Sequence, residues 1–231
     1  MQNIPLINLS YALLPLIVVG YFYYKYTGNK NEIIYSSFRM IFQLLLIGYF
    51  LVYLFTNENS IIGFFILLFM MLVSTIITLR NTNNKNFRHY IIILLSIASS
   101  SLINLIIVLY FVLEVYDYQP SIIIPISGMI FANTMNSISL SIERFEKEIK
   151  SNSFEKAREY AIKASLIPQI NSFLAVGLVS LPGMMTGQIL SGVDPLVAVR
   201  YQIMIMLMML STAGLSNIIY FKLITKQLTK G

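Results

Sequence analysis

Long apolar runs dominate the chain, and short polar segments separate them. A helix needs roughly 20 mainly apolar residues to cross a bilayer. Seven runs approach or exceed this length: 4–24, 40–56, 60–79, 90–113, 122–142, 166–190 and 201–221. The second run is the shortest, although it could extend back through Phe38 and Arg39. The pattern predicts an all-α, polytopic membrane protein with about seven transmembrane helices, forming a single transmembrane domain over residues 1–231.

The composition agrees with this prediction. Hydrophobic residues make up 57% of the 231 residues and charged residues only 11%, whereas soluble domains carry about a quarter charged residues. The chain contains no cysteine, which excludes disulfides, cysteine metal sites and thiol nucleophiles. No Lys or Arg precedes the first run, and that run is too long for a cleaved signal peptide. We therefore expect it to remain as a helix.

The basic residues indicate the orientation. Fifteen of the 16 lie on alternate connections: Lys25, Lys30, Arg39; Arg80, Lys85, Arg88; Arg144, Lys147, Lys150, Lys156, Arg158, Lys163; Lys222, Lys226, Lys230. Only Arg200 lies on the opposite set. The positive-inside rule then places the N-terminus outside and the C-terminus inside a multi-pass protein of the cell membrane. Because the basic residues are dispersed over four inner segments, we expect no nucleic-acid partner.

The longest polar segment, residues 143–165, joins the fifth and sixth runs. Its acid-first pairs, such as Glu143–Lys147 and Glu159–Lys163, have the i, i+4 spacing of a helix. We expect two short amphipathic helices separated by Ser151-Asn152-Ser153, with Asn152 and Glu155 in a capping arrangement. The segment could lie on the membrane surface, but its position favours docking of a cytoplasmic partner. The candidate docking residues are Ile149, Phe154, Ala157 and Ala161.

Polar and small residues collect in the fifth and sixth runs. They are Asn133, Asn136 and Ser139 in the fifth, and Gln169, Asn171, Ser180, Pro182 and Gly183 in the sixth. Proline removes a backbone donor, and in lipid the freed carbonyl needs another partner. Such stripes could serve helix packing alone. Together they favour a translocation path or a subunit interface, because a broken helix with facing amides recurs in transporters.

The sequence offers no catalytic constellation. No predicted span has an Asp or Glu in its interior, and the one histidine, His89, lies in a basic loop, where we expect it to be solvated. Acid–base or zinc chemistry needs such groups in clusters. A phosphate-binding loop is also absent, since the suitably spaced Gly187 and Gly192 are followed by Val193. We predict no catalytic residue, cofactor site or metal site, and expect any ATP to be bound by another polypeptide.

Several strings resemble the FetB-like family of ABC-transporter permeases. They are RMIFQLLLIGY (39–49), IPISGMIFANTMN (124–136), LIPQINS (166–172), GLVSLPGMMTG (177–187), SGVDP (191–195) and YQIMIMLMMLSTAGLS (201–216). The resemblance covers most of the chain, and the string at 177–187 is the most specific. The chain departs from the family at Ser151-Asn152-Ser153-Phe154, where relatives tend to carry a turn of the Leu-Gly-Ala-Thr type.

The resemblance implies a permease subunit that works as a homodimer with a separate ATPase subunit. It implies export of iron or a related metal, and gives the 143–165 segment the role of a coupling helix. A sugar-nucleotide or lipid-linked cargo is an alternative, as is a seven-span receptor. Methionines in the last three runs could bind a soft ion, but adaptable packing is the more common use of methionine.

Overall fold

The computed structural model describes residues 4–29, 31–56, 60–80 and 82–228. Helices account for the regular structure of these ranges, apart from one isolated bridge between Val176 and Ser180. The chain divides into two compact units, residues 1–57 and residues 58–231. The prediction of an all-α polytopic membrane protein is confirmed. A single transmembrane domain over residues 1–231 stays a prediction.

The first unit contains α1 (Leu6–Ser10), α2 (Leu13–Thr27) and α3 (Glu32–Thr56). α2 ends at Gly28, whose φ of 73° is the left-handed conformation that glycine adopts readily. The Glu32 carboxylate accepts hydrogen bonds from the Tyr23 hydroxyl (2.6 Å) and the Asn29 amide (2.9 Å). α3 therefore begins eight residues before the predicted start of the second run at residue 40, since an acidic group stabilises the first turn of a helix.

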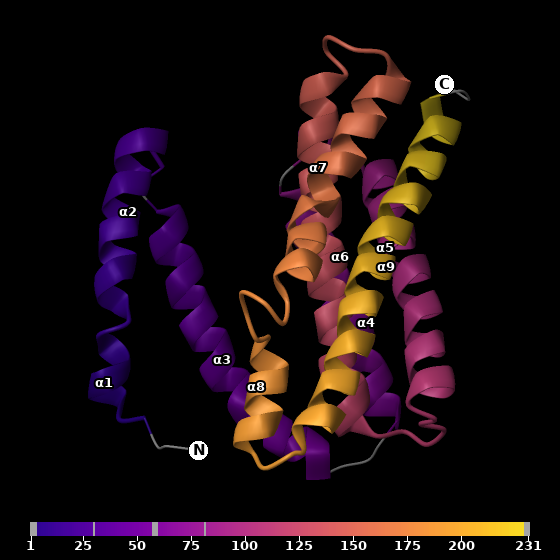
Figure 1. Ribbon diagram of the computed structural model, residues 1–231. Helices are drawn as coiled ribbons and strands as arrows, with labels where there is room; N and C mark the ends of the chain where they lie inside the picture. Colours follow the sequence, from indigo (N-terminus) through magenta and orange to yellow (C-terminus); the bar gives the residue numbers. More distant parts are fainter. Residues whose placement is uncertain (1–3, 30, 57–59, 81, 229–231) are drawn as a thin grey trace. The chain divides into compact units, whose positions relative to one another are not determined.

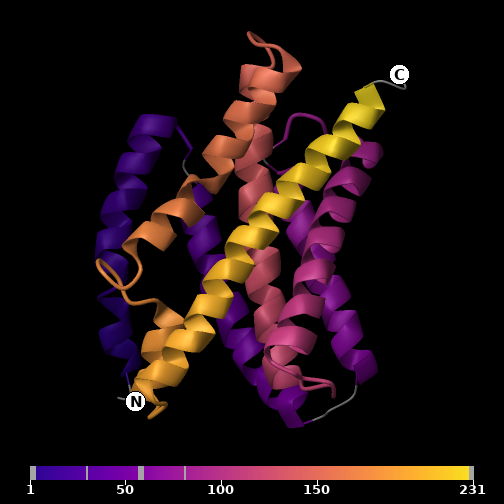
Figure 2. The same cartoon turned by 45° about the vertical axis from the view of Figure 1, so that its right-hand side comes forward.

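The second unit contains α4 (Ser60–Leu79), α5 (Phe87–Ile106), a π-helical turn η1 (Ile107–Val112), α6 (Pro120–Glu148), α7 (Phe154–Ala175), α8 (Gly183–Leu190) and α9 (Pro195–Leu228). Over both units, six helical stretches of the described ranges are long and apolar enough to cross a membrane. α7 and α8 together replace the predicted run 166–190, which is divided by a break. In both views the α6–α7 turn and the end of α9 lie at one end of this unit, opposite α8 (Figures 1 and 2).

The core of the second unit lies among α5, α6, α7 and α9. Isoleucines such as Ile93, Ile97 and Ile138 have no exposed surface. Buried hydroxyl groups bond to a carbonyl of the preceding turn, as Thr134 does to Ile130 (2.8 Å) and Thr212 does to Met208 (2.8 Å). Because these hydroxyl groups are satisfied within their own helices, small polar residues can occupy closely packed helix interfaces.

Three of the four predicted inner segments belong to the second unit, and hydrogen bonds connect them at one end of it. Glu146 of α6 accepts a bond from the Thr82 hydroxyl (2.6 Å), and the His89 Nε2 atom lies 2.9 Å from the Tyr220 hydroxyl. His89 is only 2% exposed. The prediction of a solvated histidine is therefore wrong, because α9 and the α4–α5 connection enclose the ring. The predicted orientation requires these segments to lie at the same end of the unit, as they do. The side of the membrane on which this end lies stays a prediction.

Candidate functional site

Amide side chains join α6, α7 and α9 near the middle of the second unit. The Gln169 amide donates to the Asn133 side-chain oxygen at 2.7 Å, and the Asn133 amide donates to the Met209 backbone carbonyl at 2.6 Å. Asn133 is buried. The sequence places Asn133 and Gln169 on consecutive predicted spans, and in the structure these two amides are hydrogen-bonded to each other.

A hollow of about 260 Å³ lies beside this hydrogen-bonded pair. Its lining residues are Asn133, Asn136, Pro168, Gln169, Ser172, Phe173, Met206 and Met209. The Gln169 side-chain oxygen is buried and has no hydrogen-bond partner in the described part of the chain. Asn136 is exposed. The hollow is therefore lined by an exposed amide side chain, for which no hydrogen bond is seen in the described structure, and by two methionines, while the unpaired Gln169 oxygen is enclosed by protein.

A second hollow of about 340 Å³ lies at the break between α7 and α8. It shares Phe173 and Met206 with the first hollow, so the two adjoin. Pro182 and Gln202 also line it. The Gln202 side-chain oxygen is buried and, like that of Gln169, accepts no hydrogen bond from the described residues. Each hollow is thus lined by one glutamine whose side-chain oxygen is enclosed by protein and unpaired among the described residues.

The break itself follows from local backbone chemistry. α7 ends at Ala175, whose carbonyl accepts from the Val179 and Ser180 amides at 2.8 and 3.2 Å. Gly177 adopts a φ of 80°, which glycine tolerates without strain. Pro182 then precedes the first turn of α8 in an extended conformation. The predicted interruption of the sixth run near Pro182 is confirmed.

The predicted pathway residues divide into two groups. Asn133, Asn136 and Gln169 line the first hollow and Pro182 lines the second. The other four line neither: Asn171, Ser180 and Gly183 are exposed, and Ser139 is buried within α6. The role of the predicted residues as a path stays a prediction. Gln202 was missed, although it is the first amide after the polar connection at 191–194 and could have been noticed there.

Asn217 was also missed, because a single amide in an apolar run gives little signal. It is fully buried on α9. Its amide donates to the Ser137 hydroxyl of α6 (2.8 Å) and the Ser165 hydroxyl of α7 (3.0 Å). Asn217 thereby links the three helices that carry the hollows.

The 143–165 segment differs from its prediction. Its first part continues α6 to Glu148 and its second part begins α7, so it forms the end of a helical hairpin and not two separate short helices. Ser153 caps α7 by accepting from the Lys156 amide, whereas the Asn152 side chain donates to Glu148. The predicted Asn152 cap is wrong, because the serine oxygen reaches the free amide of the first turn.

The predicted docking stripe lies mostly inside the hairpin. Ala157 and Ala161 are 0% exposed and belong to the hydrophobic core. The Phe154 ring is 5.4 Å from that of Phe145 and 6.5 Å from that of Phe221. The two alanines therefore cannot form a docking surface in this structure, because the antiparallel helices use the apolar stripe for their own contact. Ile149, at the hairpin turn, remains 39% exposed.

No group of three or more acidic, histidine or cysteine side chains that could hold a metal ion occurs within the described ranges. Four of the methionines that could bind a soft ion lie on α9, in two different environments. Met204 and Met208 are buried in the core, while Met206 and Met209 face the first hollow. Only the last two are placed to contact a solute.

The chain was compared with known protein families and sequences, and the matches agree on one family. The sequence profile of the uncharacterised protein family UPF0014 matches residues 6–156 and 150–229. A UPF0014 membrane protein of Synechocystis is 35% identical over 81% of this chain and 79% of its own length. The probable iron export permease protein FetB of Escherichia coli is 30% identical over 94% of this chain and 90% of its own length.

A plant protein is similarly related. Protein ALUMINUM SENSITIVE 3 of Arabidopsis thaliana is 33% identical over 88% of this chain and 79% of its own length. No solved structure matches the chain significantly. Relatives in bacteria and plants thus align with most of its length.

Proposed function

This chain belongs to the UPF0014 family of membrane proteins, and from that premise we propose that it is the permease subunit of an ABC transporter in the plasma membrane. A separate ATPase subunit binds and hydrolyses the ATP. The cargo is iron or a related metal, moved outward. The FetB relative, named as a probable iron export permease, supports this choice because the alignment covers nearly all of both chains.

The observation that carries the proposal is the pair of adjoining hollows at a broken helix. Their unpaired polar groups are the side-chain oxygens of Gln169 and Gln202, which are acceptors. Both oxygens are enclosed by protein in this structure, so the two side chains have to turn toward the hollows before a cation can bind them. A buried acceptor without a partner is costly, and a cation would satisfy it. Acceptor oxygens beside the thioethers of Met206 and Met209 suit a metal cation better than an anionic sugar-nucleotide.

The ATPase contact is assigned to the end of the α6–α7 hairpin. Ile149 is exposed there, among charged side chains such as Lys147 and Lys150. Contacts of α6 with α7 and of α7 with α9 connect this end to the hollows through continuous helices. A movement of the hairpin would therefore reach Asn133 and Gln169 directly. Two copies of the chain with two ATPase subunits complete the proposed transporter.

The test uses a residue that lines the hollow and makes no hydrogen bond in the described structure. Asn136→Leu removes an exposed amide and keeps the branched shape of the side chain, so folding and ATPase binding should be retained. Iron transport into inverted vesicles that carry both subunits should fall at least tenfold. Asn171→Leu is the matched control, since Asn171 is equally exposed but lines neither hollow.

Two results would contradict the proposal. Normal transport by Asn136→Leu combined with Gln202→Leu would show that the hollows are not the path. Iron-independent ATP hydrolysis together with unchanged cellular iron in a deletion strain would reject the cargo, and would favour the sugar-nucleotide or lipid-linked alternative. A chain that never co-purifies with an ATPase would support the receptor interpretation.

A further inference from the structure

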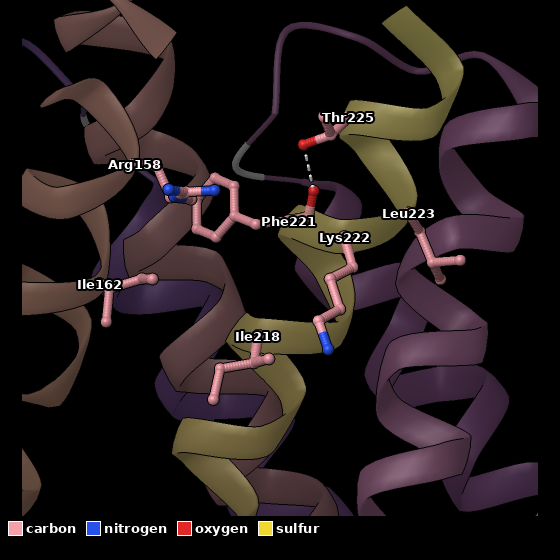
Figure 3. Close-up of a pocket in the computed structure, with 7 residues that line it drawn as sticks. All are labelled: Arg158, Ile162, Ile218, Phe221, Lys222, Leu223 and Thr225. Carbon is pink, nitrogen blue, oxygen red and sulfur yellow. Dashed lines mark hydrogen bonds between the residues drawn. The ribbon is translucent and has the colours of Figure 1, made fainter. Parts of the chain in front are cut away.

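A groove of about 480 Å³ runs between α7 and α9 near the hairpin end of the second unit (Figure 3). α7 contributes Arg158 and Ile162, and α9 contributes Ile218 and Lys222. We propose that this groove binds one anionic phospholipid of the inner leaflet. Arg158 and Lys222 would hold the phosphate once the Lys222 amine, which lies beside Ile218 in Figure 3, turns toward Arg158, and Ile162 and Ile218 would contact the acyl chains. This site is separate from the two hollows.

The expected position of the groove across the membrane agrees with a phospholipid ligand. Between Arg200 and Lys222, α9 carries 21 consecutive uncharged residues. At 1.5 Å per residue, the two basic residues are about 33 Å apart along the helix, and the hydrocarbon core of a bilayer is about 30 Å thick. This spacing places Lys222 at the edge of the hydrocarbon core, from which a lysine side chain can extend to the lipid phosphates. Ile218, one turn earlier on α9, lies in the hydrocarbon region.

The two cations lack acidic partners. Two carboxylates of the hairpin are paired with other bases: Glu148 lies 2.7 Å from Arg144, and Glu159 lies 2.5 Å from Lys163. Glu155, three residues before Arg158 on α7, forms no ion pair with it in the described structure. The Arg158 guanidinium lies 5.9 Å from the ring centre of Phe154. Within the described ranges, no carboxylate forms an ion pair with Arg158 or Lys222. Two unpaired cations beside apolar walls are complementary to a phosphate that carries acyl chains.

A second copy of the chain fits the groove less well. A two-fold contact centred here would bring Arg158 and Lys222 against their own counterparts. Charged residues are depleted from the centres of protein interfaces, and like charges repel when water is removed. Ile218 is 45% exposed, and Lys222 follows it one turn later on α9. An apolar side chain next to a cation matches a lipid, which has acyl chains next to a phosphate.

The chain contains no tryptophan, so a single introduced tryptophan reports on the groove alone. Ile218→Trp is placed in full-length protein, which is reconstituted in phosphatidylcholine vesicles with increasing brominated phosphatidylglycerol. Brominated phosphatidylcholine is the reference quencher. Quenching should reach half its maximum at a much lower fraction of the anionic lipid. Leu95→Trp on α5, also partly exposed, should show little preference.

The basic residues should account for the preference. Arg158→Gln and Lys222→Gln should each reduce the selectivity about fivefold, the effect expected for one basic group at an anionic surface. The exchange Arg158→Lys with Lys222→Arg keeps both charges and should preserve the selectivity, which separates loss of charge from misfolding. Ile162→Trp gives an independent probe on the opposite wall.

Three results would overturn the inference. They are equal quenching by the two lipids, selectivity that survives removal of both charges, and protection of the groove tryptophan from both lipids. The last result would mean that a protein surface covers the groove. None of these measurements depends on ATP or on iron, so their failure leaves the proposed transport function untouched.

Discussion

Asn217→Leu tests whether one buried amide holds three helices together. Leucine has the branched shape of asparagine and the same number of side-chain heavy atoms, but it is larger and has no hydrogen-bonding group. The added volume is shared by the control substitution at Asn104, so the comparison of the two isolates the lost bonds. The substitution removes the bonds from the Asn217 amide to Ser137 of α6 and to Ser165 of α7. It also removes a buried side-chain oxygen that has no partner among the described residues, which offsets part of the loss.

The expected loss follows from these contacts. Hydrogen bonds between membrane helices contribute about 0.6 kcal/mol on average and up to about 1.7 kcal/mol. The Ser165 hydroxyl also bonds to the Ile162 carbonyl at 2.9 Å and stays satisfied. Ser137 is fully buried and no other bond of its hydroxyl is seen in the described structure. We therefore expect the free energy of unfolding to fall by about 1–3 kcal/mol, mostly through Ser137.

Equilibrium unfolding in mixed micelles, followed by circular dichroism, measures this change. Asn104→Leu is the matched control, because Asn104 is also buried but its amide donates only within α5, to the Ser100 carbonyl at 3.0 Å. Ser137→Ala should cost little further stability when Asn217 is already leucine. If Asn217→Leu is no more destabilising than Asn104→Leu, the amide does not join the helices and the reasoning fails.

Three further substitutions test the packing and the orientation. Gly63→Ala should lower the free energy of unfolding by about 1–3 kcal/mol, because an added Cβ atom would lie 1.7 Å from the Tyr118 hydroxyl oxygen. In a Tyr118→Ala background the same substitution should cost little, as measured by thermal unfolding. Ala157→Asp should abolish the folded, monodisperse fraction in size-exclusion chromatography, since it leaves an unpaired charge in the core; a normal elution profile would reject the burial argument. In intact cells an impermeant thiol reagent should label Gln119→Cys and not Asn84→Cys, and the reverse pattern would invert the orientation.

Local sequence chemistry predicts much of the fold. The run 60–79 coincides with α4 because its twenty residues are mainly apolar and include no proline and no charged residue. Pro182 predicts an interruption because its missing amide cannot continue a helix, and α8 begins immediately after it. The amides of Asn133 and Gln169 stand out in apolar surroundings, where they need partners. They do bond to each other.

The sequence is sufficient to predict the class of protein, the apolar helices and the polar residues that need hydrogen-bond partners. It does not predict which surface each residue faces, because that depends on contacts between helices far apart in the chain. Ala157 and Ala161 have the pattern of a docking stripe, yet α6 and α9 cover them. His89 has the setting of a solvated loop residue, yet Tyr220 of α9 lies against it. An amphipathic pattern predicts that the apolar face of a helix will be buried. Which helix or partner buries it depends on contacts between residues that are far apart in the sequence.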